Sequence, residues 1–505
     1  MSPTHGYAER RVPASGDPVA TAAALAAAAT GPYVGYERHG TVLWAEGEHI
    51  SVSVTERGAV LRPADGAPEQ RVSGRPFDAL AEALSRIEVN GWTAYGWAEF
   101  GLAHAFADTR RGAMNTTVPP ELVRLMVPRR EIRLDGDTAL LRALDPDGLD
   151  ALELSLAEAC LRAESWMPVA GAEVPVDVEG HGGEEYRAVV ARAVADIRAG
   201  LLEKVILSRT VPVVGALDLP ATYLAGRRAN SPARSFLLRL GAWEAAGFSP
   251  EIVAEVTADR RVRTQPLAGT RARHGLAEAD LALRNELLCD PKEVYEHAVS
   301  VRLAAHELAG VCAPDTVCVR DFMTVKERGS VQHLGSELTG RLADGRHPWE
   351  AFAVLFPAVT ASGIPKSAAC ELIRGAELEP RGLYSGAVLT AGSDGSIDAA
   401  LVLRSVYRQG GRTWLRAGAG IVAQSDPDRE LEETREKLRS VSRHLIPATD
   451  CPESHEVQET REVHETHETP KGHEGHKSEQ RHEGQEGHRL PEAVESVPAH
   501  IRGHA

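Results

Sequence analysis

The chain has 505 residues, of which 43% are hydrophobic, and a formal net charge of −16. This length suits several domains or one large α/β unit, and the hydrophobic share is ordinary for a soluble globular protein. The acidity argues against nucleic acid and anionic membranes as main partners, because both require a basic surface. An anionic small molecule remains possible, since a local group of Arg and Lys can bind one.

The N-terminal residues predict no targeting or membrane segment. Residues 1–18 lack the apolar core of a signal peptide, and the run Ala20–Ala29 is too short and too weakly apolar to span a bilayer. Asp17 and Pro18 instead favour the start of a short helix. We expect residues 1–30 to form an N-terminal extension that is partly disordered.

The six cysteines are scattered and include no Cys-x-x-Cys pair. This pattern is typical of free thiols in a reducing compartment. We therefore predict a cytoplasmic protein. Nothing in the sequence indicates an obligate protein partner, so we expect a monomer.

From residue 31 to residue 447 the pattern is globular, without internal repeats or linkers. Short β-like runs and helical stretches alternate, at Tyr33–Tyr36, Val42–Ala45, Ile50–Val54, Phe77–Ile87 and Asp150–Ala163. This alternation predicts an α/β (α+β) fold, a single large domain with extensive antiparallel sheet flanked by helices.

The segment Lys204–Arg209 follows a stretch with helical spacing and has the pattern of a strand. Alternate side chains of a strand share a face, so Val205 and Leu207 point one way while Lys204 and Ile206 point the other. Aliphatic surroundings would disfavour the charged form of Lys204 and suit it as a general base. A lysine at the sheet edge that reaches solvent is the alternative.

Two turn-like segments come next along the chain. Glu251 ends a turn before the strand-like Ile252–Val256, and burial there would make it a general acid, although such a residue is commonly a surface turn residue. In Pro266–Arg271, Gly269 and Thr270 allow close backbone approach and offer N–H groups and a hydroxyl to a carboxylate. An ordinary turn is again the alternative.

Two predicted helices each carry carboxylates at positions i and i+3, on one face. Each helix begins with an Asp cap followed by Pro, at Asp290-Pro291 and at Asp426-Pro427. The four carboxylates are Glu293, Glu296, Glu430 and Glu433. Hard oxygen ligands of this kind suit Mg²⁺. Alternatively, Glu293 completes a capping box and all four only complement the helix dipoles.

The glycine-rich run Arg416–Val422 leads into the second of these helices. It lacks a full G-x-G-x-x-G and a βαβ context, so we reject a dinucleotide site. The sequence also has no P-loop, no G-x-S-x-G and no H-E-x-x-H. A strand ending in glycines before a carboxylate helix is better interpreted as a cradle for a small acid and a metal.

The C-terminal segment has a different composition. Residues 451–505 contain twelve Glu, nine His and six Lys or Arg, with almost no large apolar side chain. Such a segment cannot bury enough surface to offset its ordering entropy. We predict a disordered tail over residues 448–505. Its histidines could bind zinc or nickel weakly, but a solvated tail without catalytic role is the simpler interpretation.

Taken together, these segments resemble the chorismate-binding enzymes, which include anthranilate, aminodeoxychorismate, isochorismate and salicylate synthases. The resemblance covers roughly residues 31–446, and its motifs appear in family order: Lys204–Arg209, Ser249–Glu251, Pro266–Arg271, Lys292–His297, Gly382–Gly386 and Ala417–Val422 with Lys437. The stretches Asp321–Ser336 and Phe356–Lys366 are similar to salicylate synthases. Anthranilate synthases usually carry Gln where this chain has Lys204, and aminodeoxychorismate synthases commonly carry a nucleophilic Lys where it has Ala268.

The resemblance implies a Mg²⁺-dependent enzyme that converts chorismate through isochorismate to salicylate and pyruvate, with a place in siderophore assembly. It implies Lys204 as the base that activates water and Glu251 as the acid that helps the C4 hydroxyl leave. Glu296 and Glu433 would bind the metal, with Glu293 and Glu430 close by. The residues expected to hold the substrate carboxylates are Gly269, Thr270, Tyr384, Arg404, Gly418 and Lys437, while His333 and Thr360 would line the pocket near the ring.

Two other functions stay open from the sequence. An isochorismate synthase would stop after the first step. A metal-storage protein would use the His-rich tail.

Overall fold

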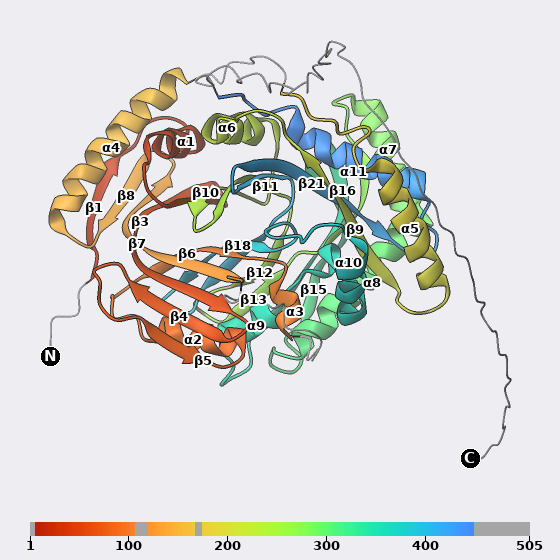
Figure 1. The fold of residues 1–505 in the computed structure, drawn as a ribbon, viewed down its shortest axis with the longest axis horizontal. Coiled ribbons are helices and arrows are strands. Elements are labelled where there is room, and N and C mark those ends of the chain that lie inside the picture. The colour runs from red at the N-terminus through yellow and green to blue at the C-terminus, as the bar shows by residue number, and fades with distance from the viewer. Residues whose placement is uncertain (1–5, 107–119, 167–173, 449–505) are drawn as a thin grey trace, which may run out of the picture. The chain divides into compact units, whose positions relative to one another are not determined.

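The computed structural model describes residues 6–106, 120–166 and 174–448. Within these residues, hydrogen bonds join 21 strands into a continuous antiparallel network (Figure 1). The strands of the first half are β1 (Ala8–Pro13), β2 (Tyr33–Arg38), β3 (Thr41–Thr55), β4 (Gly58–Pro63), β5 (Gln70–Ser73), β6 (Thr93–Ala98), β7 (Val123–Asp135), β8 (Thr138–Ala143), β9 (Lys204–Pro212), β10 (Arg234–Leu240) and β11 (Trp243–Ser249). Those of the second half are β12 (Ile252–Val256), β13 (Arg261–Thr264), β14 (Leu267–Ala272), β15 (Cys318–Arg328), β16 (Val331–Arg341), β17 (Gly363–Ile364), β18 (Ala387–Gly392), β19 (Ile397–Leu401), β20 (Ser405–Gln409) and β21 (Arg412–Ile421).

Helices flank this network. They are α1 (Pro18–Ala28), α2 (Pro76–Ser85), α3 (Leu102–Phe106), α4 (Pro146–Ser165), α5 (Gly183–Arg198), α6 (Leu219–Ala229), α7 (Ala277–Cys289), α8 (Pro291–Ala309), α9 (Pro348–Leu355), α10 (Lys366–Ala376) and α11 (Pro427–Ser442). The predicted fold class, antiparallel sheet with flanking helices, is confirmed. Among the described helices, none is both long and apolar enough to cross a membrane.

The long strands β3 and β7 pair with each other and connect two groups of strands. One group runs from β9 through β21, β20, β11, β10 and β2 to β3. The other runs from β7 through β6, β18, β19, β12 and β13 to β16. The two runs predicted within residues 42–54 are thus one strand, because β3 continues through a register shift between Glu48 and Ile50 instead of turning back.

Three apolar clusters hold these layers together. One cluster contains Tyr36, Trp97 and Phe236, from strands of both groups, and therefore lies between them. A second packs α2, α8 and α9 onto β12, β18 and β19. A third buries α1, α4, α6 and α11 against the strand group that contains β2, β10 and β11. The structure thus has helices on the outer faces and its aromatic core between the strand groups.

The N-terminal residues are more ordered than their composition suggests. Residues 8–13 form β1, which pairs along its whole length with β8. Its side chains alternate between half-buried and exposed, and the partly buried Ala8 and Val12 pack against the core. Asp17 caps α1 as predicted, by accepting the N–H of Val19 at 3.0 Å. The small alanines of α1 let it pack closely beside α4.

Two further predictions concern the cysteines and the C-terminal tail. The five cysteines of the described residues are free thiols, as predicted. The tail predicted over residues 448–505 lies, apart from residue 448, outside the described residues.

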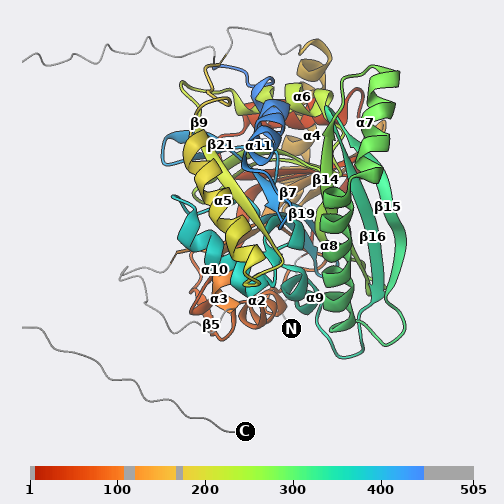
Figure 2. The ribbon, with the colours of Figure 1, turned by 90° about the vertical axis from the view of Figure 1, so that its right-hand side faces the viewer.

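Helices α8 and α11 bring the predicted metal ligands to the strands at the outer ends of the two strand groups. Helix α8 packs on β14 and β16, and α11 packs on β21, which pairs with β9 (Figure 2). Segments that lie far apart in the sequence thereby meet at one place.

Candidate active site

Lys204 begins β9 and is fully buried, with 0% of its surface exposed. Val205 and Leu207 pack into the cluster around α5, as the strand pattern predicted, and Ile206 faces a cavity. The Lys204 Nζ lies 2.9 Å from Ser300 Oγ and 3.0 Å from Glu296 Oε1. The alternative of an edge lysine that reaches solvent is therefore wrong. Its ion pair with Glu296 offsets part of the cost of burying the ammonium group.

Glu251 lies in the turn between β11 and β12, and its side chain is buried, with 1% of the residue exposed. The Leu267 N–H donates to its Oε2 at 2.7 Å, and the Thr360 hydroxyl donates to its Oε1. Burial raises the pKa of Glu251 to about 7, although these two hydrogen bonds favour the ionised form. Burial disfavours the charged carboxylate. The side chain can therefore hold and release a proton near neutral pH, as a general acid must.

Local capping explains why the two carboxylate helices begin where they do. Asp290 accepts the N–H of Lys292 at 2.9 Å and that of Glu293 at 3.3 Å. Asp426 caps α11 in the same way. Both predicted helix starts are confirmed, and both helices point their carboxylates inward, because all four glutamates are at most 5% exposed.

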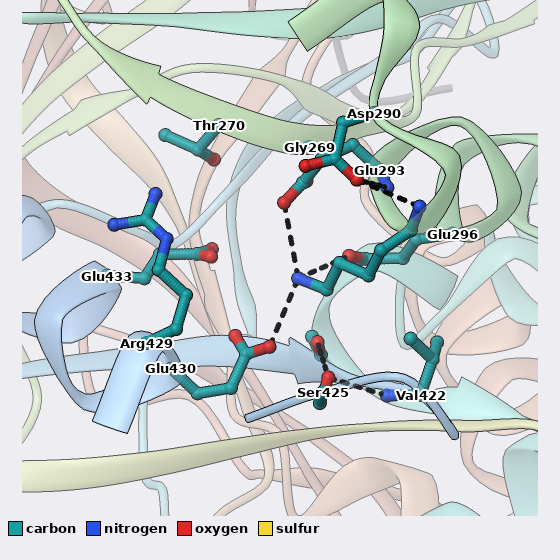
Figure 3. A network of polar contacts seen from close by, with 12 residues as sticks. Gly269, Thr270, Asp290, Glu293, Glu296, Val422, Ser425, Arg429, Glu430 and Glu433 are labelled. Carbon is teal, nitrogen blue, oxygen red and sulfur yellow. Dashed lines mark hydrogen bonds and ion pairs between the residues drawn. The ribbon is translucent and has the colours of Figure 1, made fainter. Parts of the chain in front are cut away.

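Three of the four carboxylates surround an ammonium group. Lys292 Nζ lies 3.4 Å from Glu293 Oε1, 3.6 Å from Glu296 Oε2 and 3.2 Å from Glu430 Oε1. Figure 3 labels these three glutamates. Burial raises the pKa of Glu430 to about 7. The position of Lys292 among the predicted metal ligands was not predicted, although a lysine directly before Glu293 was visible in the sequence.

Glu433 has a different electrostatic environment. Burial alone would raise its pKa, but Lys437 and Lys292 together lower it to about 2. The Lys437 Nζ lies 2.8 Å from Glu433 Oε1 and donates to the Gly418 carbonyl at 2.8 Å. Glu433 is therefore ionised at neutral pH and available as a charged oxygen ligand.

The chemistry of these side chains fits a divalent cation. Glu293 Oε2 accepts no hydrogen bond from the described residues, although it is buried. A Cβ at Gly269 would approach that oxygen to 3.0 Å, and one at Gly420 would collide with the carboxylate of Glu296. The backbone thus leaves room for carboxylates that a larger residue would displace. Buried, charged oxygen ligands are what Mg²⁺ prefers.

Another group of side chains that could bind a metal ion has a structural role instead. Among the described residues, only His39, Glu255 and Asp398 bring three ligand atoms within 4.8 Å of one another. Arg234 pairs with Glu255 at 2.9 Å and with Asp398 at 2.7 Å, and Arg263 adds another contact to Glu255. These arginines already neutralise both carboxylates, so the group is a structural ion-pair network.

Arg404, His333, Thr270 and Gly269 line one side of the cavity, which we call the anion-binding wall. The Arg404 Nη2 lies 2.6 Å from His333 Nε2, and His333 Nδ1 lies 3.0 Å from Thr270 Oγ1 and 3.3 Å from the Gly269 carbonyl. Burial, reinforced by Arg404, lowers the pKa of His333 well below its ordinary value. The ring is therefore neutral, accepts from Arg404 and donates from Nδ1. Burial also lowers the pKa of Arg404, to about 10, and Arg328 adds to this effect.

Backbone strain accompanies this wall. Arg404 and Ser385 adopt positive φ angles of 50° and 62°, which are uncommon for residues other than Gly. The two residues lie on adjoining segments, since the Ser385 N–H donates to the Val402 carbonyl at 2.9 Å. Such strain persists only where the surroundings enforce it, and it is concentrated at functional sites.

The predicted residues meet at a cavity of about 770 Å³, including its opening. Eleven of the fourteen line it: Glu251, Gly269, Thr270, Glu296, His333, Thr360, Tyr384, Arg404, Gly418, Glu433 and Lys437. Lys204, Glu293 and Glu430 lie behind this lining, where Lys204 contacts Glu296 and Lys292 connects the two glutamates. The fold therefore gathers most of the predicted site residues around one cavity.

Several residues of the site were missed from the sequence. Ser300 binds Lys204 and lies one helical turn after Glu296, so the i, i+4 spacing could have revealed it. Arg381 and Arg416 both pair with the buried Glu377, and both guanidinium groups lie over the Tyr384 ring. Glu377 and Arg381 are four residues apart, so their spacing was visible in the sequence. Arg416 comes from β21, and no local pattern indicates that it joins them.

A cavity lined by a protonatable carboxyl, a lysine and arginines belongs to an enzyme that acts on a small anionic molecule. The family model for chorismate binding enzymes matches residues 26–443. The chain therefore belongs to the chorismate-binding enzyme family, and it is an enzyme that acts on chorismate.

Individual relatives agree with this assignment. The chain is 44% identical to a salicylate synthase of Mycolicibacterium paratuberculosis over 428 residues, which cover 82% of this chain and 90% of that protein. It is 39% identical to an anthranilate synthase component 1 of Halobacterium salinarum over 313 residues, or 61% and 58% of the two chains.

Solved structures share the fold. The menaquinone-specific isochorismate synthase of Escherichia coli superposes with a TM-score of 0.64 at 21% identity, over 87% of this chain and 94% of that one. The anthranilate synthase component I of Streptococcus pneumoniae has a TM-score of 0.64 at 24% identity, over 80% and 92%.

Proposed function

We propose that the protein is a salicylate synthase, which converts chorismate through isochorismate to salicylate and pyruvate. The observation that carries the proposal is a buried carboxyl, Glu251, in the cavity wall together with a buried lysine, Lys204, which lies directly behind that wall against Glu296. Ala268 lines the same cavity and offers no nucleophile, so a small external nucleophile such as water has to attack. The 44% identity to a salicylate synthase over most of both chains supports this choice.

In the first step, Lys204 in its neutral amine form accepts a proton from the water that attacks C2 of chorismate. Glu251 donates a proton to the C4 hydroxyl, which leaves as water. The raised pKa of Glu251, about 7, makes its protonated form available at neutral pH. General acid–base help of this kind typically contributes about 10²–10⁴-fold.

In the second step, the enolpyruvyl group leaves as pyruvate by a pericyclic hydrogen shift, and salicylate forms. This step depends on orientation more than on proton transfer. Arg404 can bind a substrate carboxylate through two parallel hydrogen bonds, and the neutral His333 holds its guanidinium in place. Tyr384, Thr270 and the backbone at Gly269 and Gly418 complete the carboxylate-binding wall, with Thr360 near the ring.

Glu296 and Glu433 line the cavity and would hold Mg²⁺, with Glu293 and Glu430 behind them. When bound, the metal would act as a Lewis acid that neutralises a substrate carboxylate. The residues of the chain would orient the ring and transfer the protons.

The alternative function is that of an isochorismate synthase, because the fold is shared with enzymes of that kind. Incubation of the purified protein with chorismate and Mg²⁺, followed by chromatographic product analysis, separates the two functions. We expect salicylate and pyruvate in equal amounts. Isochorismate as the only product would refute the salicylate proposal and favour the alternative.

We further propose that residues 31–447 are the catalytic domain of a cytoplasmic monomer whose product enters siderophore assembly. The tail is dispensable, because its composition offers almost nothing to bury. A protein that ends at residue 447 should keep its melting temperature and its salicylate formation. A large drop in either would show that the tail contributes to the enzyme, and it would favour a metal-binding role of the tail histidines.

A further inference from the structure

Lys292 lies among the carboxylates of Glu293, Glu296 and Glu430, which we call the carboxylate cluster. It occupies the second position of α8, and its side chain is only 14% exposed. Its Nζ lies within 3.2–3.6 Å of carboxylate oxygens of Glu293, Glu296 and Glu430. The amino group of Lys292 therefore lies directly among carboxylate oxygens that come from two different helices.

The other cations of the site are peripheral to the cluster. Arg271 contacts Glu293 at 3.2 Å, Lys204 contacts Glu296 at 3.0 Å, and each has further partners of its own. Among the described residues, Glu430 has Lys292 as its sole ion-pair partner. Lys292 is thus the cation that joins the carboxylates of α8 to a carboxylate of α11.

We propose that the Lys292 ammonium competes with the divalent metal for these carboxylates and thereby sets the metal affinity of the enzyme. This inference rests on the metal site of the proposed function and adds a residue to it. A metal ion can bind the inward-facing oxygens only when the lysine side chain turns away from them.

Electrostatics and flexibility both support this competition. An ammonium group and a divalent cation that share carboxylates repel each other strongly in a poorly solvated site. The four-carbon stem of lysine has freely rotatable bonds, so the side chain can leave without moving the helix. The apparent metal affinity then equals the intrinsic affinity multiplied by the fraction of molecules in which Lys292 has left.

The test replaces Lys292 by Met, which keeps the length of the stem without the charge. Mn²⁺ binding to the full-length protein, measured by electron paramagnetic resonance, should become tighter by roughly tenfold or more, because the competing state is lost. The melting temperature should also rise more on addition of Mn²⁺ than it does in the wild type. Lys292→Gln provides a second variant with a polar side chain.

Lys366→Met is the matched control. Lys366 is another buried lysine, paired with Glu307 at 2.7 Å, and it lies outside the carboxylate cluster. Its replacement should lower stability without changing Mn²⁺ affinity. Unchanged or weaker Mn²⁺ binding by both Lys292 variants would overturn the proposal.

A structure of the wild type with Mn²⁺ keeps the proposal testable if neither variant folds. The manganese should be located by its anomalous signal, and Lys292 Nζ should then lie more than 4 Å from Glu430, beyond ion-pair distance. A retained ion pair would contradict the competition. If the wild type binds no Mn²⁺ at all, the metal site of the proposed function fails as well, whereas salicylate formation is assayed independently.

Discussion

Glu251→Gln removes an ionisable group from the cavity wall and preserves the shape of the side chain. In the folded protein, burial raises the pKa of Glu251 from 4.5 to about 7. Below pH 4.5 the carboxyl is protonated in both the folded and the unfolded chain. Between the two values the unfolded chain releases its proton while the folded chain keeps it, so the free energy of unfolding falls as the pH rises. Above about pH 7 the loss is complete.

The size of the effect follows from the same two pKa values. One pH unit between them corresponds to about 1.4 kcal/mol, so the complete loss is about 3 kcal/mol. About 2 kcal/mol of this falls between roughly pH 5.5 and 8, where the protein can be studied conveniently. Gln does not titrate, so the variant should gain about that much stability relative to the wild type over this interval. Its turnover of chorismate should fall by about 10²–10⁴-fold, since the proton donor is lost.

Urea unfolding of both proteins at several pH values measures the stability difference. Glu99→Gln is the matched control, because burial also raises the pKa of Glu99 to about 7, while its partner Trp243 lies outside the cavity wall. That variant should show a smaller pH-dependent gain of the same sign with activity preserved. A stability difference between wild type and Glu251→Gln that does not change with pH would refute the burial argument. Retained activity would refute the role of Glu251 as the acid.

Three further changes test the rest of the site. Lys204→Ala should reduce chorismate turnover by about 10²–10⁴-fold, yet retain much of the rate of pyruvate release from supplied isochorismate; equal losses with both substrates would contradict its role as the base of the first step. Glu433→Gln should raise the Mg²⁺ concentration for half-maximal activity by about tenfold or more, because a lost charged ligand costs at least about 1.4 kcal/mol; full activity in EDTA would exclude a metal role. Gly420→Ala should lower the free energy of unfolding in urea by about 1–3 kcal/mol, because the added Cβ would collide with Glu296. The control Gly375→Ala, on an exposed helix turn, should leave the free energy of unfolding unchanged or raise it. Equal effects of the two variants would argue against the collision.

Local signals in the sequence predicted the elements that carry the site. The Asp-Pro pairs at residues 290 and 426 predicted both helix starts, because capping depends only on neighbouring residues. The alternation in β9 predicted that Val205 and Leu207 share a face opposite Ile206, because the period of a strand is fixed by its geometry.

Properties set by tertiary packing could not be predicted in this way. Lys204 is buried against Ser300, which is 96 residues away in the sequence, so its segment alone left an exposed edge lysine open as an alternative. The position of Lys292 among carboxylates of two helices depends on how α8 and α11 meet. Likewise, β1 is ordered by its pairing with β8, whose residues lie more than a hundred positions later. In each case the deciding partner is distant in the chain.

The contacts of helix α8 connect the metal ligands to the base. Glu296 and Ser300 lie one turn apart on this helix, and both contact Lys204 Nζ. Removal of the Glu296 carboxylate would therefore withdraw a metal ligand and a contact of the base together, and a loss of activity could not be assigned to either. Glu433 lies on α11 and pairs with Lys437 instead. Its replacement separates the two roles, and for that reason Glu433 is the sharper probe of the metal.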